Sequence, residues 1–406
     1  MSANPVNSWD MMVLAATETT LGTTPAPAST AAYGALAVEA INCSLGPAET
    51  GVIRPKQDRP EGRDMQNGFV EGRVLPIPWT FDTSLKSRAA VDTPSVLLPF
   101  LKAAGLLHTV NASTNVTVTA PKQPIEGGTF AGMSLTRILG SGLAAHEAEV
   151  LRGCVAKSLR FEGGGGELMA KFAGVGIGKT TASGQAGVLG RIDSITLANG
   201  SATSLTITAE ESYRLGLGYY ICESEVIQVT ACTPGGTTAT IVRGALGTTG
   251  AAHTAQPLVP YRPTPSYLGS PIAEPVSTVT LGGVSLRCRS WSVDLTTGMD
   301  LLDPETGSRY SQGAKYGRTD CKVQLQLVLS ADQVSLMGKA QARPNLTLAL
   351  SQGTGVGGIF TFNAPNTEVV GFQAPDTAND IAVVDVSLRV RGGTGAGNDA
   401  FNFVLT

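Results

Sequence analysis

One short stretch of the chain holds residue types that could bind a nucleotide phosphate. Residues 173–180 read AGVGIGKT and fit a relaxed phosphate-loop pattern, with Lys179 and Thr180 in the lysine and magnesium positions. Such a loop needs a helix N-terminus after it, so that backbone amides surround the phosphates. The segment that follows, TASGQAGVLG, does not favour a helix. We therefore interpret residues 173–180 as a glycine-rich strand end, and an enzyme that binds phosphate through Lys179 is the alternative.

Other reactive residue types are scattered through the sequence. The histidines, His108, His146 and His253, lack the spacing of a zinc site or a catalytic dyad, and we predict structural roles for them. The acidic turn LLDPETG lacks the alternating ligands of a calcium loop. The six cysteines are far apart with no CxxC pair, so we expect buried thiols. We predict no catalytic residue, no metal site and no cofactor, and hence no enzyme.

Two charged loops are the best candidates for contacts with other molecules. The loop from Arg54 to Arg73 holds five basic and four acidic residues, a mixture that suits complementary contacts between subunits better than phosphate binding. A second charged loop runs from Asp300 to Gly317. The predicted contact residues are Arg54, Lys56, Arg59, Arg63, Arg73, Asp303, Glu305, Arg309 and Arg318.

The composition predicts a mainly β protein. Of 406 residues, 49 are Gly, and only 15% are charged, which is typical of short strands joined by glycine turns. The run Gly163–Gly166 is predicted to be a flexible hairpin turn. A net charge of −3 gives no general attraction to nucleic acid. Neither a secretory signal nor an apolar run near the ~18 residues of a membrane helix is seen, so we expect function without membrane insertion.

The two charged loops belong to a longer internal similarity. Residues 68–73 read GFVEGR and residues 313–318 read GAKYGR, which aligns two glycines and an arginine at one constant offset. Strands are predicted before and after each loop, at Val38–Leu45, Val74–Leu85, Val284–Leu295 and Lys322–Leu329. A helix follows in each half, the first with Thr93 as N-cap and the second opening at Ser330. Alternating apolar residues from Ala382 to Val390 predict a strand with one buried face. Each half is therefore predicted as a β-sandwich or barrel with one packed helix.

Residues 186–262 differ from the rest of the chain in their sequence pattern. Short β-branched runs separated by turns such as Asn199-Gly200 and Pro234-Gly235-Gly236 predict a small antiparallel β-domain, between a Gly/Ser-rich and a Pro-rich linker. The predicted organisation is residues 1–185 as a first β unit with an N-terminal arm, residues 186–262 as an inserted domain on the outer surface, and residues 263–406 as a second β unit. Such an insert leaves its host undisturbed, so we expect deletion of residues 186–262 to leave assembly intact.

Several stretches resemble the major tail tube proteins of bacteriophages with long, non-contractile tails. They are ATETTLGTTPAP, CSLGPAETGVIRPKQDRPEG, GCVAKSLRFEGGGGELMAKFAGVG, CRSWSVDLTTGMDLLDPETGS and GAGNDAFNFVLT, in that order. They cover both halves but not the insert, which resembles the immunoglobulin-like or similar small domains that decorate some tail tubes. Within it, RGALGTTGAAH (residues 243–253) resembles phrases common in phage virion proteins.

This resemblance implies a structural virion protein whose tube-like units form stacked rings around a channel for genome passage. Rings of that family usually hold six units, so two units per chain imply a trimer with pseudo-sixfold symmetry, or otherwise a hexamer. The implied partners are further copies of the chain, the tape measure and tail terminator proteins, and DNA only in transit. The implied location is the phage tail, assembled in the host bacterial cytoplasm. A β-rich cell-surface or fibre-type adhesin is the alternative.

Overall fold

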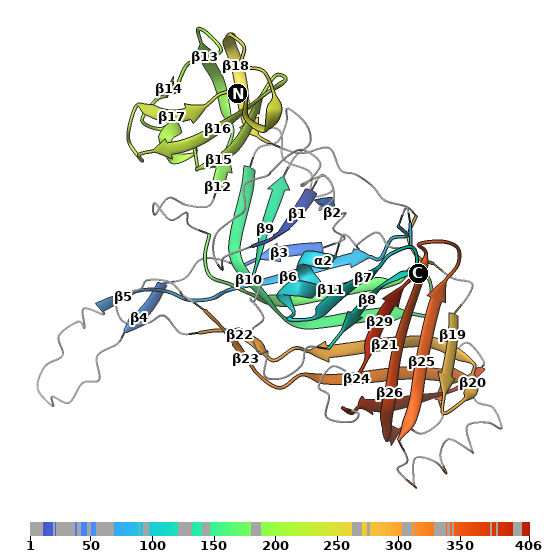
Figure 1. Ribbon diagram of the computed structural model, residues 1–406. Helices are drawn as coiled ribbons and strands as arrows, with labels where there is room; N and C mark the ends of the chain where they lie inside the picture. The colour runs from blue at the N-terminus through green and yellow to red at the C-terminus, as the bar shows by residue number, and fades with distance from the viewer. Residues whose placement is uncertain are drawn as a thin grey trace, which may run out of the picture.

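The computed structural model is built of antiparallel sheets, which confirms the prediction of a mainly β protein (Figure 1). The structure describes residues 11–18, 21, 37–38, 42–46, 50–53, 69–88, 90–91, 97–120, 132–139, 147–179, 188–261, 270–273, 277–302, 311, 313–328, 338, 342, 345–373, 376–378, 381–392 and 400–406. For the strands of residues 37–38, 50–53, 69–74 and 376–378 it describes the backbone alone.

The elements fall into three groups along the chain. The first comprises β1 (Met11–Thr17), β2 (Ala37–Val38), β3 (Asn42–Leu45), β4 (Thr50–Ile53), β5 (Phe69–Val74), β6 (Ile77–Ser84), α2 (Leu98–Ala103), β7 (Leu107–Asn111), β8 (Asn115–Thr119), β9 (Met133–Leu139), β10 (Glu147–Gly163), β11 (Met169–Gly176) and β12 (Val188–Gly190). The second comprises β13 (Ile192–Leu197), β14 (Ser204–Thr206), η2 (Glu211–Tyr213), β15 (Gly218–Cys222), β16 (Glu225–Cys232), β17 (Thr238–Val242), η3 (Ala245–Gly247) and β18 (His253–Pro260). The third comprises β19 (Ser277–Leu281), β20 (Val284–Leu286), β21 (Cys288–Thr296), β22 (Met299–Leu301), β23 (Ala314–Tyr316), β24 (Asp320–Val328), β25 (Leu346–Gly353), β26 (Ile359–Phe372), β27 (Asp376–Ala378), β28 (Ile381–Val390) and β29 (Asn402–Leu405).

The same order of strand pairings occurs twice. In the first strand set, β1 pairs with β2 and β9, β9 with β10, β10 with β11, β11 with β6, β6 with β3, and β4 with β5. In the second strand set, β19 pairs with β20 and β25, β25 with β26, β26 with β28, β28 with β24, β24 with β21, and β22 with β23. The last strand of each set, β12 or β29, pairs with the long strand β10 or β26.

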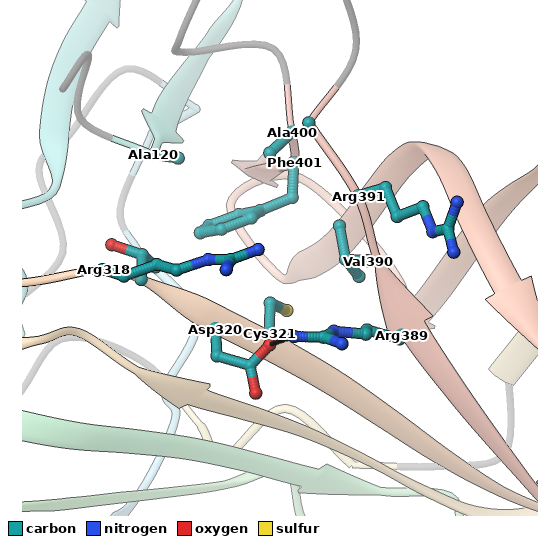
Figure 2. Close-up of a pocket in the computed structure, with 11 residues that line it drawn as sticks. Ala120, Arg318, Asp320, Cys321, Arg389, Val390, Arg391, Ala400 and Phe401 are labelled. Atoms are coloured by element: carbon teal, nitrogen blue, oxygen red, sulfur yellow. Dashed lines mark ion pairs between the residues drawn. The ribbon is translucent and has the colours of Figure 1, made fainter. Parts of the chain in front are cut away.

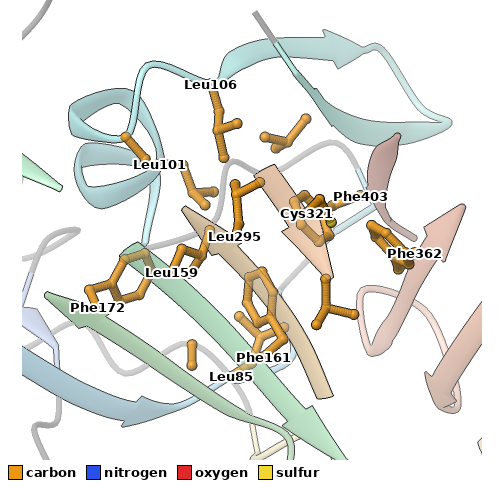
Figure 3. Close-up of a cluster of buried hydrophobic side chains, with 14 of the residues drawn as sticks. Leu85, Leu101, Leu106, Leu159, Phe161, Phe172, Leu295, Cys321, Phe362 and Phe403 are labelled. Atoms are coloured by element: carbon orange, nitrogen blue, oxygen red, sulfur yellow. The ribbon is translucent and has the colours of Figure 1, made fainter. Parts of the chain in front are cut away.

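The two strand sets join edge to edge. Residues Ser158–Gly163 of β10 pair with Trp291–Thr296 of β21, so one sheet runs from β3 through β6, β11, β10, β21 and β24 to β28. A single hydrophobic core lies behind this sheet and draws on both sets (Figure 3). At its centre the ring of Phe161 lies 4.9 Å from Phe360 and 5.0 Å from Phe403.

Residues 192–260 form a separate six-stranded sheet, in the order β13-β18-β15-β16-β17-β14, at one end of the molecule (Figure 1). Its core is continuous with apolar side chains of the first strand set, because Met12, Leu14 and Ile138 are buried against it. The predicted linkers are partly strand: β12 lies in the Gly/Ser-rich stretch, and β18 takes in the start of the Pro-rich one.

The predicted elements can now be compared with those observed. A helix follows β6, but its described part is only α2, and Thr93 lies outside the described residues. Of the second predicted helix only Gly338 and Ala342 are described, and both are helical. Each predicted charged loop starts and ends as a two-stranded hairpin, β4–β5 or β22–β23. No described helix is long and apolar enough to cross a membrane.

Candidate interaction surfaces

The face of the large sheet opposite its core is polar and carries paired charges. Arg160 Nε lies 2.6 Å from Glu162 Oε1 and 3.3 Å from Asp294 Oδ1, which links β10 to β21. Lys171 Nζ on β11 lies 2.6 Å from the other Glu162 oxygen. Two shallow hollows of about 390 and 420 Å³ share Arg160, and Asp82 lines the first. This face is therefore hydrated and nearly balanced in charge.

The same polar face continues over the second strand set. The hollow that contains Arg160 is also lined by Gln324, Gln326 and Asp385. Towards the far end, Asp320 accepts from Arg389 at 3.3 Å and lies 3.8 Å from Lys322 Nζ. The basic side chains of this face named so far thus each have a carboxylate within 4 Å.

The large sheet ends at two edges that lack a strand partner among the described residues. At one end, β3 pairs with β6 alone. Gly46 N donates to Pro78 O at 2.8 Å, and because antiparallel pairs alternate, the backbone groups of Cys43 and Leu45 face away from β6. The Cys43 carbonyl accepts a long hydrogen bond of 3.5 Å from Arg137. At the other end, β27 and the last residues of β26 pair with β28 alone.

An arginine-lined hollow of about 490 Å³ lies where β24 begins and β28 ends. Figure 2 shows Arg318 extending between Phe401 and the ion pair of Asp320 with Arg389, while Arg391 points away. Arg391 forms an ion pair with Glu368. Only part of the positive charge is therefore neutralised at this hollow by the contacts seen here.

A buried ionic cluster holds the sheet of residues 192–260 together. The carboxylate of Glu225 accepts from Arg243 Nε at 2.7 Å and Nη2 at 2.6 Å, and from the amides of Gly244 and Ala251 at 2.9 and 3.0 Å. His253 places one ring nitrogen 2.8 Å from Glu225 and the other 2.8 Å from Glu223. Burial on its own would raise the pKa of Glu225, but these donors lower it to about 2. Glu225 is therefore ionised at every physiological pH.

The predicted contact residues are only partly placed by the structure. Seven of them lie outside the described residues: Arg54, Lys56, Arg59, Arg63, Asp303, Glu305 and Arg309. Arg73 lies in β5, where the backbone alone is described. Arg318 is exposed beside the arginine-lined hollow. Sequence reasoning missed Arg389 and Arg391, since only the pairing of β24 with β28 brings Arg389 close to Asp320.

The structure also places some of the residues that the sequence suggested as possible ligands or catalytic groups. Lys179 forms an ion pair with Glu149 at 3.0 Å, and both side chains are largely buried. His108 is half-buried, and burial followed by the nearby Lys102 lowers its pKa. His146 lies outside the described residues. Among the described residues no cluster of His, Cys, Asp and Glu could hold a metal ion.

The cysteine prediction needs one correction. All six cysteines are free, and four are buried, but Cys232 and Cys288 are only half-buried. Burial raises the pKa of Cys43 to about 12 and that of Cys222 to about 11. These two thiols therefore stay protonated and unreactive at neutral pH.

The glycine run at residues 163–166 is a hairpin turn, as predicted, but it is anchored. Gly164 N donates to Gln352 Oε1 at 3.1 Å, and Gln352 Nε2 donates to Gly166 O at 3.1 Å. Gly164 has φ +89 and lies so close to Ser290 that a side chain would not fit. Gln352 is fully buried, so it fixes the turn from the second strand set.

No protein-family model matches the chain, and no curated protein matches it.

Proposed function

We propose that this chain is a structural protein that closes into rings and stacks them into a tube, as the tail tube subunit of a long-tailed bacteriophage. The observation that carries the proposal is the β10–β21 junction, where the first strand set pairs edge to edge with the second. In the repeated pairing order, β3 corresponds to β21, and β26 corresponds to β10. At the ends of the large sheet, β3 and β26–β27 lack a strand partner among the described residues. In the ring, the next copy of the chain pairs with one of these edges and the preceding copy pairs with the other.

The repeated pairing order supports two tube-like units in each chain. Seven pairings recur in the same order, and the aligned glycines and arginine of residues 68–73 and 313–318 fall in the matching strands β5 and β23 or next to them. Within this proposal, residues 192–260 are an inserted domain between the units. Both units then present equivalent edges, which a closed ring requires.

Ring closure follows from repeating the internal junction. In the chain, β10 of the first unit pairs with β21 of the second. The matching contact between chains joins β26–β27 of one copy to β3 of the next. Closure pairs both of these edges of the large sheet, which would otherwise promote uncontrolled association. Three chains give six units, and hence a trimer with pseudo-sixfold symmetry.

The polar face of the sheet suits the lining of a channel for DNA. Arg160, Lys171, Lys322 and Arg389 are all paired with carboxylates, so this face offers few free cations to phosphate groups. Glutamine side chains such as Gln324 and Gln326 add hydrogen-bonding groups without charge. A DNA duplex that passes along this face therefore stays hydrated and is not bound tightly by it.

The direct test is electron microscopy and native mass spectrometry of the purified protein. We expect rings or tubes, and a closed species of about 125 kDa, three times the chain mass of 41.7 kDa. A protein that stays monomeric under all assembly conditions would count against the proposal. A ring of six chains would keep the tube but refute the trimer.

Hydrogen exchange tests the junction itself. We expect amides of β3, in particular Cys43 and Leu45, to gain protection on assembly, because they face away from β6 in the single chain. The amides of β21 that already pair with β10 serve as the internal control and should not change. Rings without added protection in β3 would show that the sheet does not continue between chains.

A further inference from the structure

His253 opens strand β18 with its ring between two carboxylates. Its Nδ1 lies 2.8 Å from Glu223 Oε2, and its Nε2 lies 2.8 Å from Glu225 Oε2. The ring is buried, with 1% of the side chain exposed, whereas half of the Glu223 side chain is in water. Glu223 lies in the turn between β15 and β16, and Glu225 is the first residue of β16. A single ring thus connects this turn and β16 to β18.

Both contacts require a proton on each ring nitrogen. A neutral imidazole has one N–H donor and one acceptor nitrogen, whereas the imidazolium has two donors. An ionised carboxylate only accepts, and exposed glutamates are ionised near neutral pH. Glu225 is ionised as well, since its pKa lies at about 2 despite its burial. A neutral ring would place a nitrogen lone pair against a carboxylate, so the geometry fits the charged ring of His253.

The charges around the ring balance when the ring is protonated. Arg243 donates to both oxygens of Glu225, at 2.7 and 2.6 Å, and is itself buried. With a charged His253, these two cations face the two carboxylates of Glu223 and Glu225. Loss of the ring proton leaves one negative charge in excess, at a site where little water can compensate for it.

The other elements packed on the ring add no net charge. Cys222 ends β15, and burial, followed by the two glutamates, raises the pKa of its thiol to about 11, so the thiol is neutral near neutral pH. On β13, Leu197 pairs with His253, and the one charged residue of that strand, Asp193, accepts from Arg191 at 2.9 Å. The rest of β18, TAQPLVP, has no titratable side chain. The charge of this cluster near neutral pH therefore depends on the ring of His253.

The backbone on both sides of the contact between His253 and Glu223 is strained. Glu223 has φ 53, and Ala255, two residues after the histidine, has φ 53 as well. Residues with a side chain seldom adopt this left-handed conformation, which persists only where surrounding contacts hold it. The turn has only two residues between the paired Cys222 and Glu225. The contact with the ring is therefore one of the few restraints on this turn.

We propose that protonated His253 fastens the turn between β15 and β16 to β18, and that loss of the ring proton releases this turn. Glu225 stays bound to Arg243 and to two backbone amides when this happens, so the rest of the sheet keeps its structure. The switch lies within residues 192–260 and does not depend on the proposed ring of chains.

Nuclear magnetic resonance of isotope-labelled histidine rings tests the protonation state. At about pH 7.5, roughly one unit above the ordinary histidine value of about 6.5, we expect both ring nitrogens of His253 to carry a proton. His108 is the internal control: burial, followed by the nearby Lys102, lowers its pKa, so its ring should be neutral at this pH. A His108→Gln variant identifies the control signal. A neutral His253 ring under these conditions would overturn the proposal.

Hydrogen exchange then follows the turn itself. The readouts are the amides of Cys222 and Glu225, which pair across the turn, expressed as protection relative to an unfolded chain at the same pH. We expect their protection to fall by about tenfold or more when His253 loses its proton, because a charge-assisted hydrogen bond is lost. The amides that join β16 to β17 farther along the sheet should keep their protection.

Two glutamine variants link the two measurements. Glu223→Gln keeps the shape of the side chain, but its amide group can donate to a neutral ring nitrogen. In this variant we expect His253 to lose its proton at lower pH and the protection of the turn to stop following that titration. Glu210→Gln is the matched control, since Glu210 is 82% exposed and contacts Arg214 instead of the histidine. It should behave like the unchanged protein. Turn protection that stays constant while His253 titrates, or an unchanged response in Glu223→Gln, would overturn the proposal.

Discussion

Glu225 holds both ends of the loop from Arg243 to His253, because its two carboxylate oxygens accept from Arg243 at one end and His253 at the other. The backbone between these ends includes Leu246 with φ 55, a conformation that few residues other than glycine adopt. The cluster therefore offsets local backbone strain.

Replacing Glu225 tests this role. We expect Glu225→Gln to destabilise the sheet of residues 192–260 by about 3–5 kcal/mol, because it leaves Arg243 buried without a counter-charge. Glu223→Gln is the control, since Glu223 contacts the same histidine but is half exposed. Hydrogen exchange of residues 219–260 measures both. Equal effects from the two variants would contradict a special role for Glu225.

The same carboxylate predicts how this sheet responds to acid. The pKa of Glu225 is lowered from its ordinary value of 4.5 to about 2 in the folded protein. A lowered folded pKa contributes stability that is complete above the unfolded value and is lost as the pH falls towards the folded one. We expect this sheet to lose stability between about pH 4.5 and 2, measured by hydrogen exchange. Glu225→Gln should flatten that dependence.

For single residues, the sequence showed which residue types could do chemistry, but not which other residues they contact in the fold. Lys179 could be set aside as a phosphate ligand because no helix-forming segment follows it. Its partner Glu149, and the partner Gln352 of the glycine turn, are distant in sequence and come close only through strand pairing. No local pattern identifies such contacts.

Among the elements, the short helix α2 depends on one side chain. Phe100 stacks on Phe81 at 4.5 Å and lies 4.9 Å from Phe172, so a helix of six residues is fixed to β6 and β11. We expect Phe100→Ala to cost about 3–5 kcal/mol of stability, measured by urea unfolding. Leu107→Ala is the control, because Leu107 is 44% exposed and should change stability little.

Strand periodicity could be read from the sequence where one face is buried. Val323, Leu325 and Leu327 are all buried, as their alternation predicts. Val384, Val386, Leu388 and Val390 are buried as well, and Ala382 at the start of that predicted strand is half-buried. The strand ends inside the charged loops were missed, because a lone hairpin such as β4–β5 has no alternating buried face to predict it.

For the whole molecule, the shared core changes what removal of residues 186–262 would do. The deletion, expected from the sequence to be harmless, also removes β12 and uncovers Met12, Leu14 and Ile138. We now expect this deletion to give aggregation, scored by size-exclusion chromatography. Deletion of residues 192–260 alone, with Met12 and Leu14 changed to Thr and Gln, should stay soluble and assemble. An unmodified deletion that assembles normally would contradict this view.

The duplicated order of elements could be predicted from the aligned segments 68–73 and 313–318 and from the matching strands that flank them. The way the two strand sets share one sheet could not, since the β10–β21 junction has no signature in either segment. The predicted boundaries at residues 185 and 263 therefore separate segments of the sequence, but they do not separate hydrophobic cores, because both strand sets contribute to one core.

The pairing of β8 with β29 has a consequence for the timing of folding during synthesis. Val116 to Thr119 pair with Asn402 to Leu405, so this edge of the sheet is completed by one of the last described elements to leave the ribosome. Gln352, which anchors the turn at Gly164, is also made late. A partly translated chain therefore lacks the finished sheet. In the proposed ring, copies still being made on one messenger RNA would not yet join as complete chains do.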